Sequence, residues 1–164
     1  MEKEAVIKMS EIDRLKSIVE QLRSENGCPW DKAQTHVSLK PGCIEEAAEV
    51  IAGINILEKT GDADNLKEEL GDLLLQIMFH AVMAEEEGFF TFDDVACAIS
   101  DKMVRRHPHV FGDAKFATED ELHESWAEIK RKEKEGKQWQ AEYLPGAFNE
   151  AEELIRKARE RKGF

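Results

Sequence analysis

The chain has 164 residues, and its 35 Asp and Glu against 23 Lys and Arg give a formal net charge of −12. This length suits one domain, and a hydrophobic share of 41% excludes a disordered acidic tail. The charge also argues against nucleic acid as a partner, because phosphate backbones attract basic surfaces. A phosphorylated ligand would therefore need a local reversal of charge, most simply by bound divalent metal.

Cysteine usage and the lack of long apolar runs indicate the compartment. Cys28, Cys43 and Cys97 are odd in number and lack CxxC spacing. We therefore predict neither a disulfide framework nor a zinc site, and expect Cys28 and Cys43 only to pack. Residues 1–16 are charged throughout and contain no signal-peptide core. The longest apolar stretch, residues 73–84, is too short for a membrane span, so a soluble, cytoplasmic protein without membrane contact is expected.

Apolar periodicity and capping residues predict a helical chain. The expected helices cover residues 10–27, 44–57, 65–86, 91–107, 118–136 and 147–162. Ser10 and Asp13 form an imperfect capping box at the first, and Thr118 and Glu121 form a clean one at the fifth. Pro108 ends the fourth helix. No stretch alternates with period two, so the predicted fold is all-α, with the second and third helices as its buried antiparallel pair.

The second and third helices carry carboxylates inside otherwise apolar sequence. Glu46 and Glu49, like Glu69 and Asp72, are three residues apart, so each pair shares a helix face. Facing carboxylates in a dry groove repel one another, and hard divalent cations such as Mg²⁺ neutralise them best. The alternative is that the acids decorate helix starts, where the helix dipole favours them. Neither pair has a His three residues on, which argues against a di-iron site, and His80 is expected to have a structural or supporting role.

These carboxylates belong to an ordered set of motifs. EExxE at residues 45–49, followed about twenty residues later by ExxD at residues 69–72, resembles the signature of the MazG nucleoside triphosphate pyrophosphohydrolases of the all-α NTP pyrophosphatase group. The resemblance covers roughly residues 12–132. It includes the motifs CPWDKAQTH, EELGDLLLQ, EEEGFFTFDDV and SDKMVRRHPHVFGD.

The resemblance implies a helical bundle of this type, with the second and third helices as a metal-binding pair. It also implies Mg²⁺-dependent cleavage of the α–β phosphate bond of an NTP or dNTP to the monophosphate and pyrophosphate, in nucleotide-pool housecleaning, with Mn²⁺ as a substitute metal. The implied catalytic residues are Glu45, Glu46, Glu49, Glu68, Glu69 and Asp72. The implied metal ligands among them are Glu46, Glu49, Glu69 and Asp72. A carboxylate orients the attacking water, so no side-chain nucleophile is needed.

Five further residues are candidates for substrate binding: Lys102, Arg106, Trp126, Trp30 and His36. Lys102 and Arg106 share a helix face, and the resemblance assigns them to the triphosphate, although they also fit a cationic helix C-terminus. Trp126 matches a family position near the base, or else anchors the fifth helix. Trp30 and His36 line the pocket, or else Trp30 caps the core.

The resemblance also bears on domain organisation and assembly. We expect a pyrophosphohydrolase domain over residues 1–143 and a polar C-terminal helix or connector over residues 144–164. Long family members carry two such domains in tandem, and the chain resembles the first. The family is typically dimeric, and the excess of apolar helix face predicts a homodimer or higher homo-oligomer.

One departure and two alternative functions remain open from the sequence. Gly42 and Cys43 stand where bulkier family residues are common, which predicts a looser start of the second helix. One alternative function is a relative specialised for a single pyrimidine nucleotide or for phosphoribosyl-ATP. The other is a non-catalytic helical oligomerisation or regulatory module that binds metal and nucleotide without turnover.

Overall fold

Helices account for the regular structure of residues 9–164, the part of the chain that the computed structural model describes. Within that part there is no strand, so the predicted all-α fold is confirmed. None of its helices combines the length and the apolar run that crossing a bilayer requires. Residues 1–8 belong to the stretch predicted to lack a signal-peptide core, and they lie outside the described residues.

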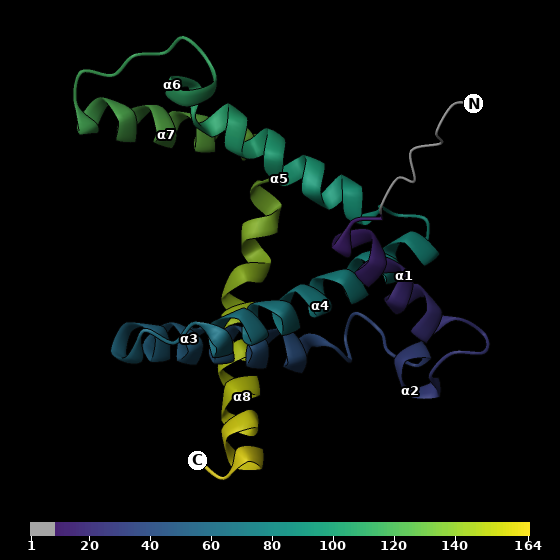
Figure 1. Cartoon of the computed structure of the whole chain (residues 1–164). Helices are drawn as coiled ribbons and strands as arrows, with labels where there is room; N and C mark the ends of the chain where they lie inside the picture. The colour runs from purple at the N-terminus through teal and green to yellow at the C-terminus, as the bar shows by residue number, and fades with distance from the viewer. Residues whose placement is uncertain (1–8) are drawn as a thin grey trace, which may run out of the picture. The chain divides into compact units, whose positions relative to one another are not determined.

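The chain divides into two compact units, residues 1–92 and residues 93–164. In the described part of the first unit the helices are α1 (Glu11–Arg23), α2 (Pro29–Lys32), α3 (Lys40–Thr60) and α4 (Asp64–Glu86) (Figure 1). These two units are defined by how compactly their residues pack in space, and not by the extent of the family domain. The predicted extent of the family domain, residues 1–143 with a connector over residues 144–164, stays a prediction.

Local capping explains where the helices of the first unit begin and end. The Ser10 hydroxyl accepts a hydrogen bond from the Asp13 N–H at 3.1 Å, and the Asp13 carboxylate accepts from the Ser10 N–H at 3.4 Å. The predicted capping box at α1 is therefore confirmed. Gly61 ends α3 with a left-handed φ of 77°, which favours glycine. The short helix α2, with Pro29 in its first turn, lies in a segment predicted as loop.

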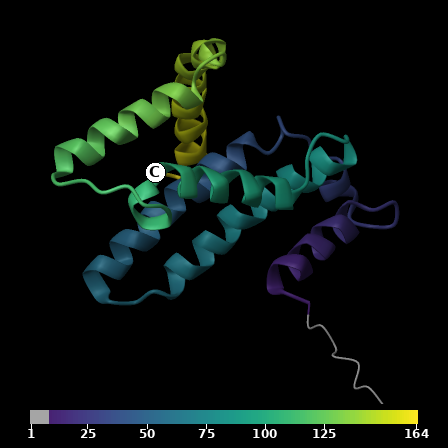
Figure 2. The same cartoon turned by 90° about the horizontal axis from the view of Figure 1, so that it is seen from above.

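The helices α3 and α4 run antiparallel and lie side by side in both views (Figure 1, Figure 2). The core of this unit lies where α1 packs on the C-terminal half of α4. Its buried residues are Val19, Leu39, Met78, Phe79, Val82 and Met83. The predicted carboxylates of α4 precede this core in the chain, so they lie on the part of the α3–α4 pair outside it.

Two glycines of α3 allow α4 to approach closely. A Cβ at Gly53 would lie 2.8 Å from the Cα of Leu66, and a Cβ at Gly42 would lie 2.9 Å from Oε1 of Gln76. Both distances are shorter than packed carbon and oxygen atoms tolerate. The two positions are separated by about three helical turns, so both face α4. The absent side chain at Gly53 therefore permits the close approach of the two backbones, whereas at Gly42 only the flexible end of Gln76 would have to move.

The helix α3 differs from the sequence-based expectation in its start and in its burial. The helix begins at Lys40 rather than at residue 44, so Gly42 and Cys43 lie in its first turn. A looser start of the helix stays a prediction. Proline at the second helical position is tolerated because the first N–H groups have no intrahelical partner. The helix is also not buried all round, because only one side of it meets α4. Ile51 is 61% exposed and Ile54 is 49% exposed.

The second unit contains α5 (Phe92–Arg106) from its second residue on, α6 (Pro108–Phe111), α7 (Glu119–Glu133), the 3-10 helix η1 (Gln138–Tyr143) and α8 (Leu144–Lys162). α5 ends directly before His107 and Pro108, as predicted. At α7 the Thr118 hydroxyl accepts from the Glu121 N–H at 3.3 Å. The Glu121 carboxylate accepts from the Ala117 N–H at 2.7 Å instead of returning to Thr118, so only half of the predicted capping box forms.

Candidate metal and phosphate sites

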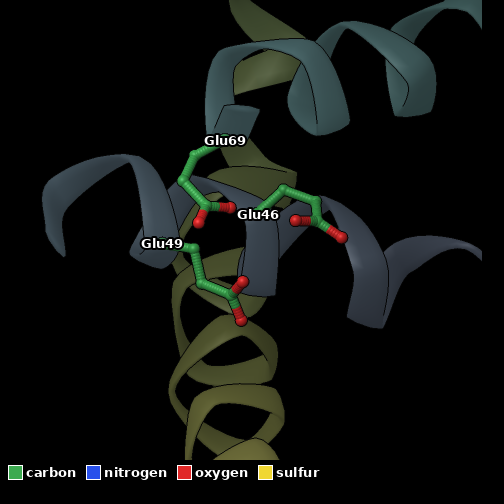
Figure 3. Close-up of side chains that lie close together, drawn as sticks. All are labelled: Glu46, Glu49 and Glu69. Atoms are coloured by element: carbon green, nitrogen blue, oxygen red, sulfur yellow. The ribbon is translucent and has the colours of Figure 1, made fainter. Parts of the chain in front are cut away.

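Three carboxylates converge between α3 and α4, and we refer to Glu46, Glu49 and Glu69 as the acidic group. One carboxylate oxygen of each lies within 4.8 Å of those of the others, and all three residues are half-buried. Figure 3 shows Glu46 and Glu49 arising from α3 and Glu69 from α4. Their convergence follows from the three-residue spacing on α3 and from the close approach of the two helices.

Asn65 orients one member of the acidic group. Its Nδ2 donates a hydrogen bond to Oε1 of Glu69 at 2.8 Å, four residues further along α4. The bond restricts the glutamate side chain and involves only one of its two carboxylate oxygens. Sequence reasoning missed this residue, although its i,i+4 spacing is a signal that could have found it.

The other predicted catalytic carboxylates flank the acidic group. Asp72 is half-buried on α4, three residues beyond Glu69, and is not a member of the converging set. Glu45 is half-buried on α3, whereas Glu68 is exposed on α4. The structure therefore brings together three of the four predicted metal ligands. The catalytic roles of all six carboxylates stay predictions.

The acidic group fits a hard divalent cation. It offers only carboxylate oxygens, on two helices that are packed against each other. Mg²⁺ and Mn²⁺ prefer oxygen ligands, whereas zinc and copper sites use sulfur or imidazole. Carboxylates this close repel one another unless a cation or protons neutralise them. The donor set and its partial burial thus suit the predicted metal class.

Three further polar side chains of the first unit, those of His36, Cys43 and His80, contact one another. Nδ1 of His80 lies 2.7 Å from Nδ1 of His36, and the two rings stack with centroids 5.0 Å apart. Sγ of Cys43 lies 3.4 Å from Nε2 of His80. Burial raises the pKa of the Cys43 thiol and lowers the pKa of the His80 imidazole, which favours a neutral pair. Cys43, expected only to pack, therefore also makes a polar contact.

Arg23 of α1 fastens the loop that carries Trp30. Its Nη1 donates to the carbonyl oxygens of Asp31 at 2.8 Å and Gln34 at 3.2 Å. Its Nε and Nη2 donate to the Glu86 carboxylate at 2.9 Å and 2.7 Å. Trp30 itself is 66% exposed, so it does not cap the core of this chain. Its contact with a substrate stays a prediction.

The second unit holds a cavity of about 720 Å³, which we call the basic cavity. Lysine and arginine predominate in its lining, and a single acidic residue accompanies them. The lining residues are Ala98, Lys102, Arg105, Arg106, Ile129, Lys130, Lys132, Glu133, Lys134, Lys137 and Gln140. Its volume is typical of ligand pockets, which span ~300–1,000 Å³. Such a concentration of cations in a chain of net charge −12 favours an anionic ligand.

Both residues predicted to contact the triphosphate, Lys102 and Arg106, line the basic cavity. Arg106 donates from Nε and Nη2 to Oε2 of Glu133 at 3.0 Å and 2.6 Å. Arg105 donates from the same two atoms to Oε1 of Glu133 at 3.0 Å and 2.7 Å. These hydrogen bonds lower the pKa of Glu133 to about 2, so its carboxylate is ionised at neutral pH. Sequence reasoning missed Glu133 because it lies far along the chain on another helix.

Trp126 joins α7 to the end of α5. Its Nε1 donates to the Arg106 carbonyl oxygen at 2.6 Å, and its ring meets the His107 ring edge-on with centroids 5.3 Å apart. Nζ of Lys130 lies 5.1 Å from the centre of the indole. These contacts support the anchoring role, and a role beside the nucleotide base stays a prediction.

Comparison with known proteins identifies the family. Residues 34–111 match the MazG nucleotide pyrophosphohydrolase domain. The chain carries a MazG domain. It is 49% identical to the nucleoside triphosphate pyrophosphohydrolase of Escherichia coli K12 over 127 residues, which are 77% of this chain and 47% of that protein. It is 50% identical to the nucleoside triphosphate pyrophosphohydrolase/pyrophosphatase MazG of Thermotoga maritima over 122 residues, 74% of this chain and 45% of that protein.

A third relative is the uncharacterized protein YabN of Bacillus subtilis, 49% identical over 132 residues, 80% of this chain and 26% of that protein. The chain thus spans about half or less of the length of these curated relatives. The matched MazG segment contains the acidic group together with Lys102 and Arg106, and it ends before Trp126 and Glu133. The acidic group belongs to the first compact unit and the basic cavity to the second.

Proposed function

We propose that this chain hydrolyses nucleoside triphosphates, NTP or dNTP, at the α–β phosphate bond to the monophosphate and pyrophosphate. The convergence of Glu46, Glu49 and Glu69 within 4.8 Å carries this proposal, because such a set suits a divalent cation and a triphosphate is usually bound together with one. The MazG match and the names of the Escherichia coli and Thermotoga maritima relatives support the reaction type.

The carboxylates of the first unit would hold the cation and prepare the water. In this proposal Glu46, Glu49 and Glu69 are metal ligands and Asp72 is a fourth. Bound Mg²⁺, or Mn²⁺ in its place, supplies charge neutralisation for the phosphates and a more acidic water. A neighbouring carboxylate, Glu45 or Glu68, accepts the proton of the attacking water. The broken P–O bond leaves its electron pair on the departing phosphate oxygen.

Residues outside the acidic group would bind the substrate. Lys102 and Arg106 contact the triphosphate, since they line the basic cavity and phosphate oxygens accept strong hydrogen bonds from such cations. Trp126, Trp30 and His36 contact the nucleoside. The exposure of Trp30 supports its share of this role, because an aromatic face on the surface is open to stacking.

The reaction is tested by measuring pyrophosphate release from each NTP and dNTP with Mg²⁺, for wild type beside Glu49→Gln. We expect release by the wild type and at least a tenfold loss in the variant. Glu58→Gln is the matched control, because Glu58 is an exposed residue of the same helix and lies outside the acidic group. Equal release by wild type and Glu49→Gln would show that the metal assignment is wrong.

The same panel separates the two alternative functions. A relative specialised for one pyrimidine nucleotide, or for phosphoribosyl-ATP, shows turnover with that substrate alone. A regulatory or oligomerisation module shows heat of binding for Mg²⁺ and nucleotide in calorimetry but forms no product. Turnover of several triphosphates favours the general housecleaning role.

Assembly as a homodimer, or a higher homo-oligomer, is part of this proposal. Ile51, Ile54, Leu70 and Ile77 of the α3–α4 pair are between 42% and 61% exposed, and apolar surface of this kind favours association. Sedimentation at micromolar concentration should give a mass above 18.7 kDa, the mass of a single chain. A mass of 18.7 kDa would contradict the prediction. The proposed compartment is the cytoplasm, and neither nucleic acid nor membrane is a proposed partner.

A further inference from the structure

Arg105 and Arg106 are neighbours in sequence, and their side chains nevertheless meet at one point. Successive residues on a helix diverge by about 100°, yet each of these arginines turns its Nε–Nη2 edge to Glu133. Each edge delivers two hydrogen bonds to one carboxylate oxygen, at distances from 2.6 Å to 3.0 Å. The two guanidinium groups therefore form a cradle that holds a pair of oxygen atoms.

The charge around this cradle exceeds what Glu133 neutralises. One carboxylate faces two guanidinium groups, and it is the only acidic residue that lines the basic cavity among the described residues. Lys102, Lys134 and Lys137 also line the cavity, and within residues 9–164 they take part in none of the ion pairs that the structure contains. Like charges gathered at this density favour a multiply charged anion.

A phosphate group matches the cradle better than the carboxylate does. Its oxygens accept the same edge-on pairs of N–H donors, and arginine is the side chain best shaped for such pairing. A terminal phosphate carries close to two negative charges, whereas Glu133 carries one. It also has a third oxygen, and Lys102 lies on the same face of α5, three residues before Arg105, to receive it.

We propose that Arg105 and Arg106 together bind a phosphate group of the substrate, and that Glu133 occupies their cradle until phosphate displaces it. This inference rests on the proposed function for the identity of the ligand. It adds Arg105 as a binding residue and makes Glu133 an internal competitor that sets the affinity for polyphosphate. If Glu133 occupies the cradle in most molecules, phosphate can bind only to the remaining fraction. The apparent affinity for phosphate is then the intrinsic affinity multiplied by that fraction.

The test is calorimetric binding of inorganic pyrophosphate to the full chain in EDTA, so that neither metal nor turnover contributes. We expect Glu133→Gln to bind pyrophosphate about tenfold more tightly than wild type, because the cradle is then open. The matched control is Glu153→Gln on α8, which removes the same charge from a carboxylate that also accepts from an Nε and an Nη2, those of Arg156. The control should change the affinity less than twofold.

A second variant distinguishes the geometry of the two arginines from a general effect of positive charge on pyrophosphate binding. Adding Arg105→Lys to Glu133→Gln keeps the net charge but removes the planar edge, and we expect it to reverse most of the gain. Circular dichroism shows whether Glu133→Gln folds, and Glu133→Asp replaces it if it does not. We expect Glu133→Asp to bind pyrophosphate at least threefold more tightly than wild type, because the shorter side chain no longer reaches both arginines. Equal tightening by Glu133→Gln and Glu153→Gln, or no effect of Arg105→Lys, would overturn the proposal.

The outcome is independent of the hydrolysis assay. If Glu133→Gln tightens pyrophosphate binding and no triphosphate is turned over, the cradle stands and the proposed reaction fails. If triphosphates are turned over and Glu133→Gln binds pyrophosphate as wild type does, the reaction stands and the cradle fails.

Discussion

The acidic group and the basic cavity handle concentrated charge in opposite ways. The acidic group gathers carboxylates alone and steadies one of them with a neutral amide, that of Asn65. The basic cavity gathers cations around an internal counter-charge, Glu133. In the proposed function a mobile metal ion would balance the charge of the acidic group, whereas the positive charge of the basic cavity already meets a carboxylate within the chain. The two regions therefore respond differently to added ions.

Reversing one charge in the acidic group would make it resemble the basic cavity, in which a cation and a carboxylate pair within the chain. This change is expected to have the largest effect on activity. In Glu69→Lys the ammonium would pair with Glu46 and Glu49 and replace the metal. Pyrophosphate release should fall about a hundredfold or more, because loss of even a residue that only supports a metal ligand costs ~10–100-fold. The melting temperature in EDTA should rise, because like-charge repulsion is relieved.

Glu58→Lys is the control for this variant, since it makes the same change at an exposed position of α3. It should retain both the activity and the melting temperature of the wild type. A Glu69→Lys protein that still releases pyrophosphate at the wild-type rate would remove the acidic group from the mechanism.

The geometry of the acidic group depends on the close approach of α3 and α4. In Gly53→Ala the new Cβ would lie 2.8 Å from Leu66 Cα, which is backbone and cannot turn aside. We expect a loss of about 1–3 kcal/mol in the free energy of unfolding, as for other overpacked sites, measured by urea denaturation. In Gly71→Ala the added Cβ meets nothing within 4 Å, so this control should gain about 0.5–1 kcal/mol. Equal changes at the two positions would contradict the account.

Arg23 shows how the first unit uses an arginine to hold together backbone carbonyl groups and a carboxylate. Arg23→Lys keeps the charge but loses the fork that reaches Asp31, Gln34 and Glu86 at once. The side chain is 8% exposed, so the free energy of unfolding should fall by about 1–3 kcal/mol, the cost of leaving buried polar groups without partners. Arg14→Lys, at a surface pair with 62% exposure, should change it by less than ~0.5 kcal/mol. A larger loss at Arg14 than at Arg23 would refute this view of the loop.

Lowering the pH tests the ion pairs of Glu133 in the basic cavity. The expected change in protein stability is the smallest of the effects predicted here. The pKa of Glu133 is lowered from 4.5 to about 2 by its bonds to Arg106 and Arg105. A carboxyl with a lowered pKa in the folded protein stabilises it fully above the unfolded value and loses this contribution as the pH falls through the folded value. The stability difference between wild type and Glu133→Gln should therefore shrink between pH 4.5 and pH 2. Urea denaturation at several pH values measures it, and a constant difference would contradict the pairing.

Features with local causes could be predicted from the sequence. The capping box at Ser10 and the end of α5 before Pro108 depend on residues that are neighbours in the chain. The acidic group was within reach because a three-residue spacing fixes a helix face and a short connection makes α3 and α4 antiparallel. These two rules predict that the two carboxylate pairs can meet, although they do not show that Asp72 stays outside the converging set.

Features that depend on distant residues could not be predicted. The pairing of Arg106 with Glu133 joins residues 27 positions apart, and no pattern in either helix announces it. The helices α2 and α6 have four residues each, too few to show a period. The exposure of Ile51 was missed because apolar residues predict burial, whereas the partner that would cover them need not lie in the same chain.

One glycine of α3 has a consequence for the choice of cation. Gly53 lies four residues beyond Glu49 on α3, and the backbone of α4 packs closely against it. In the proposed metal site the distance between α3 and α4 is therefore a gauge for the ion that the carboxylates would enclose. Mg²⁺ needs oxygen atoms at about 2.0–2.1 Å, whereas Ca²⁺ accepts about 2.3–2.6 Å and more ligands. A methyl group at position 53 would widen the gauge. In the proposed metal site, Gly53 would thus limit the ionic radius without touching the ion.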